Sequence, residues 1–143
     1  MSEPRWLNVT MLLAIHSDQI QQHGGSLGLR DRGLLESALH RPRNRHHYEA
    51  ACELVDLAAA YGFGIARNHP FVDGNKRVAF QAMYVFLAIN GLRIDAEEAE
   101  VVRAILALAA GEMDDAQLSA SGITHQTGLT SSYALLASLV DAP

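Results

Sequence analysis

The sequence lacks several features that mark particular classes of protein. It has a single cysteine, Cys52, which cannot form an internal disulfide, and this fits a reducing cytosol. Its longest apolar run is well short of the ~20 residues that a membrane-spanning helix requires. The N-terminus has no basic segment followed by a long apolar core, so we expect no signal peptide. These absences predict a soluble, cytoplasmic protein that does not associate with membranes.

An excess of positive charge is also missing. The formal net charge is −5 and the pI is near 5.7, so the chain has no general basic footprint for nucleic acid. One basic cluster stands out, and such a run is usually a solvated helix face, with binding to an acidic patch of a partner as the alternative. Its members are Arg41, Arg43, Arg45, His46 and His47. We expect no direct nucleic-acid binding.

The apolar residues that are present recur with helical spacing. The chain has 143 residues, of which 49% are apolar, enough for one domain with a single core. The spacing predicts helices over residues 9–22, 32–40, 49–66, 74–90, 95–110, 114–120 and 133–140. The sequence therefore predicts an all-α bundle of six or seven helices, with one hairpin-like insertion at the glycine-rich residues 24–28.

Four details of this pattern can be checked directly. Asp31 is placed to cap the second helix, and Pro42 is expected to stop it. Cys52 falls in the third helical pattern and is expected to be a small buried residue. Gly91 is expected to end the most apolar helix.

The most informative stretch runs from His69 to Arg77 and has the sequence His-Pro-Phe-Val-Asp-Gly-Asn-Lys-Arg. Residues 78–89, which follow it, are almost entirely apolar and predict a buried helix. Lys76 and Arg77 therefore stand at a helix N-terminus, where each cation costs roughly 0.3–1 kcal/mol against the peptide dipoles. Two adjacent cations in this position indicate a bound anion. A helix N-terminus with a glycine and two cations predicts a phosphate site.

Two side chains in this stretch carry candidate chemistry. His69 is the candidate general base, because an imidazole titrates near neutral pH and can accept the proton of an attacking hydroxyl. The alternative is a histidine that only hydrogen-bonds within the loop. Asp73 is the candidate magnesium ligand, because Mg²⁺ on nucleotide phosphates prefers carboxylate oxygen. The alternative for Asp73 is a helix N-cap.

The four residues that follow are candidates for holding phosphate. Gly74 permits a strained turn or a close backbone approach. Asn75 either hydrogen-bonds a phosphate or holds the loop. Lys76 supplies a point charge and Arg77 a planar fork that fits phosphate oxygens, with a solvated surface pair as the alternative.

The residues at the start of the stretch have expected structural roles. Phe71 is expected to anchor the loop in the core, and Pro70 to stiffen it. Arg67 and Asn68, immediately before the candidate base, are weaker candidates for lining a cleft.

The stretch resembles the signature of the Fic/Doc (Fido) superfamily. That signature is His-Pro-Phe-x-Asp/Glu-Gly-Asn-Gly/Lys-Arg, and residues 69–77 match it at every position. Lys76 is the option favoured in the Doc (death-on-curing) branch. The resemblance covers roughly residues 7–120, and its other segments are Ile15-His16, Gly24-Gly25, Gly28-Leu29-Arg30-Asp31, residues 35–38, Arg41-Pro42 and residues 86–91.

The resemblance also assigns a role to the glycine-rich segment. In the family this segment forms a flap beside the active-site cleft, along which the target docks. The resemblance places the flap at about residues 24–31, with Gly24, Gly25, Gly28, Leu29, Arg30 and Asp31 as candidate docking residues. The C-terminus departs from the family, because residues 121–143 have no counterpart there. We expect a single Fido domain over residues 1–143 with an atypical extension at its end.

The resemblance implies an enzyme that uses ATP and Mg²⁺ to modify a protein hydroxyl. His69 would take the proton of a Ser or Thr hydroxyl, while Asp73 and residues 74–77 hold the phosphates. In the adenylylating Fic branch a glycine stands where this chain has Lys76, and AMP is transferred. Doc-type proteins bind ATP inverted and transfer its terminal phosphate. We therefore expect a protein Ser/Thr kinase, with AMP transfer as the alternative because Pro70 and Gly74 also match the adenylylating pattern.

The resemblance also implies partners. Many Fic enzymes inhibit themselves with a helix carrying Ser/Thr-x-x-x-Glu-Gly/Asn, and this sequence has no such stretch. Inhibition is then expected from an antitoxin that wraps the active-site groove, which makes this chain the toxin of a type II toxin–antitoxin pair. The expected target is a translation factor such as elongation factor Tu, with growth arrest as the outcome.

Two other classes of function agree less well with the sequence. One is an inactive nucleotide- or phosphate-binding module that only docks a partner, against which the complete set of chemical groups argues. The other is a metallohydrolase, for which the sequence lacks the ligands: the histidines outside the motif form no metal-binding pattern.

Overall fold

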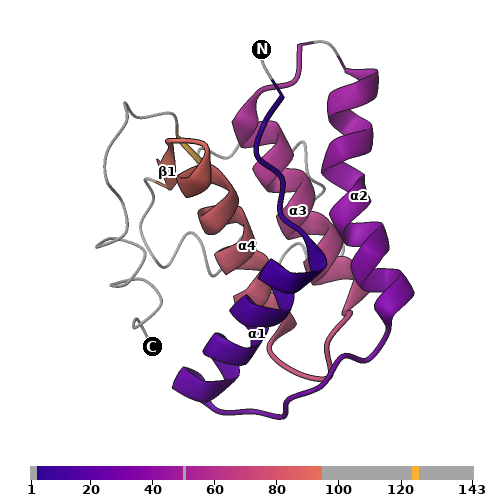
Figure 1. Cartoon of the computed structure of the whole chain (residues 1–143), viewed down its shortest axis with the longest axis vertical. Coiled ribbons are helices and arrows are strands. Elements are labelled where there is room, and N and C mark those ends of the chain that lie inside the picture. The colour runs from indigo at the N-terminus through magenta and orange to yellow at the C-terminus, as the bar shows by residue number, and fades with distance from the viewer. Residues whose placement is uncertain (1–2, 50, 95–123, 126–143) are drawn as a thin grey trace.

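The computed structural model describes residues 3–49, 51–94 and 124–125. Within these ranges the chain is helical, as the all-α prediction requires. Its helices are α1 (Val9–His23), α2 (Arg32–Tyr48), α3 (Leu54–Asn68) and α4 (Asn75–Ile89), shown in Figure 1. Two strands of two residues each, β1 (Arg93–Ile94) and β2 (Thr124–His125), pair in antiparallel fashion. No helix among the described residues has both the length and the apolarity needed to cross a membrane.

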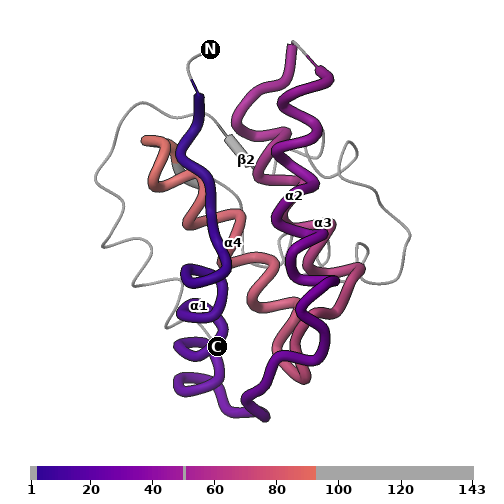
Figure 2. The backbone as a smooth tube through the Cα atoms, turned by 45° about the vertical axis from the view of Figure 1, so that its right-hand side comes forward, coloured from indigo at the N-terminus to yellow at the C-terminus, as the bar shows by residue number. Residues whose placement is uncertain are grey.

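α3 is the central helix of the described part. It packs between α2 and α4, and α1 lies against α4 (Figures 1 and 2). The apolar faces of these helices form one core, because burying them removes their side chains from water. The largest side chains with almost no exposure are Tyr61, Tyr84, Phe71, Phe86, Leu7, Leu12, Leu35, Leu57, Ile65, Met83 and Leu87.

α2 and α3 approach each other closely at a glycine. A Cβ atom added at Gly64 would lie 3.2 Å from both Cα and Cβ of Ala38. This is tighter than ordinary van der Waals contact, so the absence of a side chain at this position sets the spacing of the two helices.

The prediction that Pro42 stops the second helix is wrong. α2 runs through Pro42 to Tyr48, although a proline inside a helix removes one backbone hydrogen bond and costs about 3 kcal/mol. Contacts with α3 hold the second half of the helix. Arg41 lies over the ring of Phe63 at 4.2 Å, and Arg45 Nη1 donates to the carbonyl of Asp56 at 3.2 Å. These tertiary contacts keep the turn beyond Pro42 helical.

α3 begins later than its apolar spacing predicted. The helix starts at Leu54 instead of residue 49, because the N–H of Glu53 donates to Asp56 Oδ2 at 2.9 Å and closes a capping turn there. Cys52 therefore lies in the loop before α3, and its placement in a helix is wrong. Its burial is confirmed, since it is 8% exposed.

The N-terminal segment is fixed to α3 by a buried hydrogen bond. The N–H of Leu7 donates to the hydroxyl of Tyr61 at 3.0 Å. Burial raises the pKa of Tyr61 to about 12, although the Leu7 N–H and the charge of Arg43 act in the opposite direction. The neutral phenol is therefore the form that the folded core favours.

The remaining elements follow the predictions or fall outside the described residues. The bounds of α1 and α4 lie within a residue of those expected, and Asp31 caps α2 by accepting from the N–H of Leu34 at 2.9 Å. Gly91 ends α4 with φ +86°, its N–H donating to the carbonyl of Ala88. The helices expected over residues 95–110, 114–120 and 133–140 lie outside the described ranges.

Candidate active site

Two loops meet at one end of the helices (Figure 1). We call residues 69–74 the motif loop and residues 24–31 the flap. The flap is not a hairpin that pairs with itself: Leu29 forms an isolated antiparallel bridge with Phe71, and Val72 N–H donates to the Gly28 carbonyl at 3.0 Å. The motif loop and the flap are therefore joined by their main chains, as the resemblance led us to expect for a flap beside the site.

His69 stands at the C-terminus of α3 in a left-handed conformation. Its φ is +49° and its ψ +56°, and it is the only residue other than glycine with positive φ among the described residues. Its N–H closes the last turn by donating to the Ile65 carbonyl at 3.2 Å, and its side chain is exposed. A left-handed conformation is strained for a residue with a Cβ, and such strain is concentrated at functional sites.

Asn75 holds the motif loop from inside. It is 6% exposed, its Oδ1 accepts from the N–H of Phe71 at 2.9 Å, and its Nδ2 donates to the Phe71 carbonyl at 2.9 Å. The same Nδ2 lies 3.4 Å from Nδ1 of His69, a long contact that orients the ring only loosely. Of the two alternatives for Asn75, the geometry favours the one that holds the loop.

Phe71 anchors the motif loop in the core, as expected. It is 1% exposed, and its ring stacks on that of His16 with 4.0 Å between centroids and 8° between planes. Nε2 of His16 lies 2.9 Å from the carbonyl oxygen of Asp73, so one buried side chain from α1 contacts the loop at both Phe71 and Asp73. Sequence reasoning missed this role, although His16 falls in the same helical stripe as Leu12 and Ile20.

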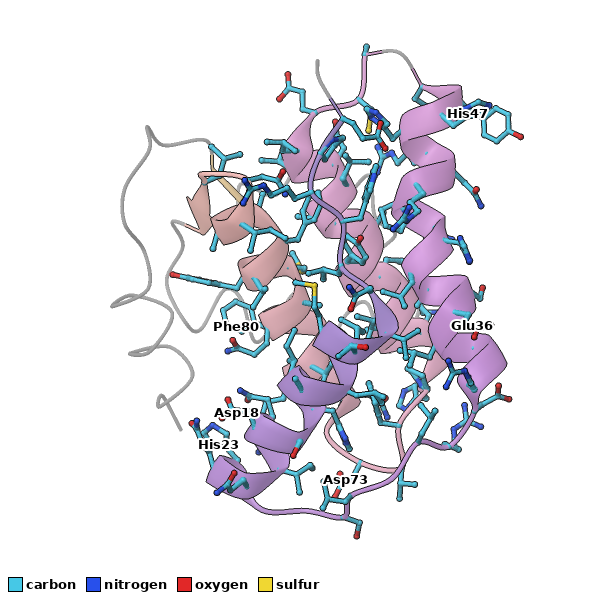
Figure 3. The ribbon with its side chains drawn as sticks, in the orientation of Figure 1. Asp18, His23, Glu36, His47, Asp73 and Phe80 are labelled. Carbon is cyan, nitrogen blue, oxygen red and sulfur yellow. The ribbon has the colours of Figure 1, made fainter. Side chains whose placement is uncertain are left out.

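Asp73 points its carboxylate toward the flap, in the lower part of Figure 3. Oδ1 accepts from the N–H of Gly74 at 2.9 Å, and Oδ2 accepts from the N–H of Ser26 at 3.2 Å. The side chain is exposed. The N-cap alternative for Asp73 is not what the structure shows, because Gly74 is the N-cap of α4.

The residues around Asp73 fit a magnesium ion that arrives with a nucleotide. The described residues contain no group of three or more His, Cys, Asp or Glu side chains able to hold a metal ion by themselves. A single carboxylate that keeps lone pairs exposed is nevertheless a common protein share of a Mg²⁺ site, in which phosphates and water supply the remaining oxygens.

The N-terminus of α4 is open to an anion. Gly74 adopts φ +77°, and no side chain caps the helix there. Lys76 and Arg77 are exposed, and within the described part of the chain neither takes part in an ion pair. The uncapped helix end and two cations form the arrangement that the sequence predicted for phosphate.

Gly25 lets the flap lie directly on Asp73. A Cβ atom at Gly25 would lie 2.6 Å from Asp73 Oδ2, and the residue has φ +115°. Beside it, Leu27 and Val72 are 66% and 55% exposed, so each loop presents one large apolar side chain to solvent.

The two weaker cleft candidates differ in their surroundings. Asn68 uses its side chain within the fold, since Nδ2 donates to the carbonyl of Leu34 in α2 at 3.0 Å. Arg67 is exposed at the last turn of α3. The geometry gives Asn68 a packing role.

Comparison with known proteins identifies the same stretch of the chain. The family model described as the Fic/DOC family matches residues 6–87, which contain both loops. A protein of Mycolicibacterium smegmatis named Toxin Doc is 39% identical over 112 residues, 73% of this chain and 86% of that protein. A protein of Escherichia phage P1 named Protein kinase doc is 34% identical over 90 residues, 63% of this chain and 71% of that protein.

Proposed function

The chain belongs to the Fic/DOC family, and from this premise we propose that it is a toxin-type enzyme that transfers the terminal phosphate of ATP to a Ser or Thr hydroxyl of another protein. The names of its relatives, Toxin Doc and Protein kinase doc, support the two halves of this proposal. The observation that carries it is the open N-terminus of α4, flanked by the candidate base His69 and the cations Lys76 and Arg77.

His69 acts as the general base. The target hydroxyl approaches the exposed imidazole, which takes its proton as the hydroxyl oxygen forms a bond to the terminal phosphorus. The bond from that phosphorus to the bridging oxygen breaks, and ADP leaves. Asn75 and His16 do not touch the reactants; they hold the backbone that follows the base, through Phe71 and Asp73.

The phosphates are held by α4 and its first turn. The backbone N–H groups after Gly74 and the side chains of Lys76 and Arg77 stabilise the negative charge that spreads over the transferred phosphate. Asp73 would hold Mg²⁺, which supplies charge neutralisation on the phosphate oxygens when bound.

Transfer of the terminal phosphate is favoured over transfer of AMP by Lys76. A long cation at this position excludes the placement of one phosphate that a glycine would permit, and this favours the inverted nucleotide. The runner-up is AMP transfer, which Pro70 and Gly74 also permit.

We propose an antitoxin and a translation factor as the protein partners. The antitoxin would bind over the candidate site formed by the motif loop and the flap and inhibit in trans. The target would be a factor such as elongation factor Tu, and its modification would arrest growth.

The proposal is tested by supplying a bacterial extract with purified protein and ATP labelled on either the γ- or the α-phosphate. Label from γ alone on a protein band supports a kinase, and label from α alone establishes AMP transfer instead. His69→Ala is expected to lower transfer by about 10²–10⁴-fold, the usual contribution of general-base catalysis. The matched control is His40→Ala, which removes another exposed histidine on α2.

Label from neither position, with antitoxin removed, overturns both enzymatic proposals and leaves a binding module. A growth assay also distinguishes an enzyme from a binding module. Expression without antitoxin is expected to arrest growth and His69→Ala to relieve it, whereas equal growth with both favours the binding module.

A further inference from the structure

Arg30 belongs to the flap, but its side chain points back to the end of α3. Its Nε donates to the carbonyl of His69 at 2.6 Å, and its Nη2 donates to the carbonyl of Asn68 at 2.8 Å. Its own N–H donates to the Pro70 carbonyl at 2.7 Å. The residue thus makes three hydrogen bonds to three consecutive carbonyl groups, which include that of the candidate base.

These bonds satisfy a recurring need of a helix terminus. The last carbonyls of α3 have no partner inside the helix and carry the negative pole of its dipole. A guanidinium group meets both conditions, because it is positively charged and presents parallel N–H donors in a rigid plane. A lysine has the charge but lacks the planar fork that reaches two successive carbonyls together.

The bonds also bear on the strained conformation of His69. Its left-handed backbone, with φ +49°, directs the imidazole away from the path that a continuing helix would give it. Such a conformation costs on the order of 1–3 kcal/mol and persists only where surrounding contacts hold it. Arg30 donates to the carbonyl of His69, and the N–H of His69 donates to the carbonyl of Ile65, so both main-chain polar groups of His69 are hydrogen-bonded.

We infer that Arg30 is a positioning residue for the reaction: its guanidinium fixes the backbone of His69 and so orients the imidazole that acts as general base. The inference rests on the proposed function. It also changes the role that family resemblance gave to this residue, since two of its donor groups are committed to α3 and not turned toward a target.

The kinetic test compares Arg30→Ala and Arg30→Lys with Arg32→Ala. Arg32 is two residues away, and its substitution removes the same charge while breaking only an exposed pair with Glu36. Initial rates of γ-label transfer are measured while ATP and extract are varied separately. Arg30→Ala is expected to lower the saturating rate by about 10–100-fold, the usual cost of a misplaced catalytic group, with both half-saturating concentrations within about twofold.

The variants separate positioning from docking. Arg30→Lys is expected to recover little of the rate, whereas guanidinium ion added at millimolar concentration recovers part of the rate of Arg30→Ala. Arg32→Ala is expected to behave as the unsubstituted protein. A higher half-saturating extract concentration with an unchanged saturating rate means that Arg30 contacts the target, and this overturns the inference.

A second measurement needs no reaction, so that failure of the proposed function is recognised separately. Amide hydrogen exchange at His69 reports whether its N–H bond to Ile65 stays closed. Exchange at this amide is expected to be about tenfold faster in Arg30→Ala than in Arg32→Ala, at equal global stability. Unchanged exchange overturns the inference, and faster exchange with an unchanged transfer rate reduces Arg30 to a structural role.

If the unsubstituted protein transfers no label, the proposed function fails, and the exchange result still decides whether Arg30 fixes His69.

Discussion

The motif loop and the flap meet at the same site but are held by different means. The motif loop has its own anchors inside the protein, with Phe71 1% exposed in the core and Asn75 bonded to both main-chain groups of Phe71. In the flap only Leu29 is partly buried, and the other residues are exposed. The flap is held by main-chain bonds to the motif loop, by the bond from Ser26 N–H to Asp73, and by the Arg30 side chain on the Asn68 and His69 carbonyls. Its glycines let it approach the motif loop closely.

This difference separates two tasks. The loop that carries the candidate base is anchored in the core, and Arg30 of the flap adds hydrogen bonds to the carbonyls of Asn68 and His69. The flap, which resemblance assigns to docking, has little buried surface of its own, a property of segments that open at low free-energy cost. Four experiments test this contrast, in order of decreasing expected effect.

Breaking the anchor of the motif loop is expected to have the largest effect. Asn75→Ala leaves the N–H and carbonyl of Phe71 without their partners, which costs about 1–3 kcal/mol for each buried group. The transfer rate is expected to fall by more than ~100-fold as the base loses its position. Urea unfolding and γ-label transfer measure the two effects.

Asn44→Ala, at an exposed position of α2, is the control for Asn75→Ala and is expected to change neither quantity. A full rate in Asn75→Ala would mean that the motif loop does not need its internal anchor.

Disrupting the close contact between the flap and Asp73 is expected to lower the transfer rate by less. In Gly25→Ala the added Cβ would collide with Asp73 Oδ2 at 2.6 Å, so either the flap or the Asp73 carboxylate must shift. The transfer rate is expected to fall about tenfold, while the free energy of unfolding falls by only about 1 kcal/mol, the cost of a side chain at positive φ. The same two assays measure this change.

Gly24→Ala is a matched control, because Gly24 also has positive φ but a Cβ there meets nothing within 4 Å. It should lose similar stability and keep its rate within about twofold. If both variants lose the same rate, contact between the flap and Asp73 is not what matters.

The open helix end next to both loops can be probed without any target. Lys76 is the only lysine of the chain, so an amine-reactive ester marks it and, apart from it, only the terminal amine. ATP with Mg²⁺ is expected to slow modification of Lys76 several-fold, because a bound phosphate pairs with the ammonium and restricts access to it. Peptide mapping by mass spectrometry measures the rate, and adenosine, which has no phosphate, is the control. Equal protection by adenosine would place the nucleotide elsewhere.

The smallest expected effect lies away from both loops. Tyr61→Phe removes the acceptor of the Leu7 N–H and is expected to cost about 1 kcal/mol of stability while leaving transfer unchanged. The folded pKa is raised to about 12 from 10.0, so the stabilisation is complete below pH 10 and declines between pH 10 and 12, as the unfolded tyrosine ionises first. Unfolding curves over this range should decline less steeply in Tyr61→Phe than in the unsubstituted protein. Identical slopes would contradict this account of the Tyr61 pKa.

The sequence predicted those parts of the fold that depend on local spacing. α1 and α4 bury apolar side chains at helical spacing, and their bounds were expected within a residue. One prediction failed where contacts between distant residues decide the end of a helix, and another where a local capping turn, not apolar spacing, decides the start of a helix. Pro42 does not end α2 because α3 holds the turn beyond it, and α3 begins at a capping turn that the apolar pattern around residue 49 does not reveal.

The candidate site shows the same division. Residues 69–77 are contiguous, so the pattern itself predicted that His69, Asp73 and the start of α4 lie together. The contribution of His16 and the contacts of Arg30 could not be predicted in this way. His16 joins Asp73 across 57 positions and Arg30 joins His69 across 39, and hydrogen bonds over such separations leave no local period in a sequence.

The close contact between Gly64 and Ala38 determines how near α2 and α3 lie to each other. α2 begins where the flap ends, and α3 ends at Asn68, next to His69, so the spacing of the two helices bears on the separation of the flap from the base. A methyl group added at position 64 would push α2 and α3 apart, although it would contact neither nucleotide nor target. Small side chains at positions 38 and 64 thus permit the helix spacing on which the relative placement of the flap and the base depends.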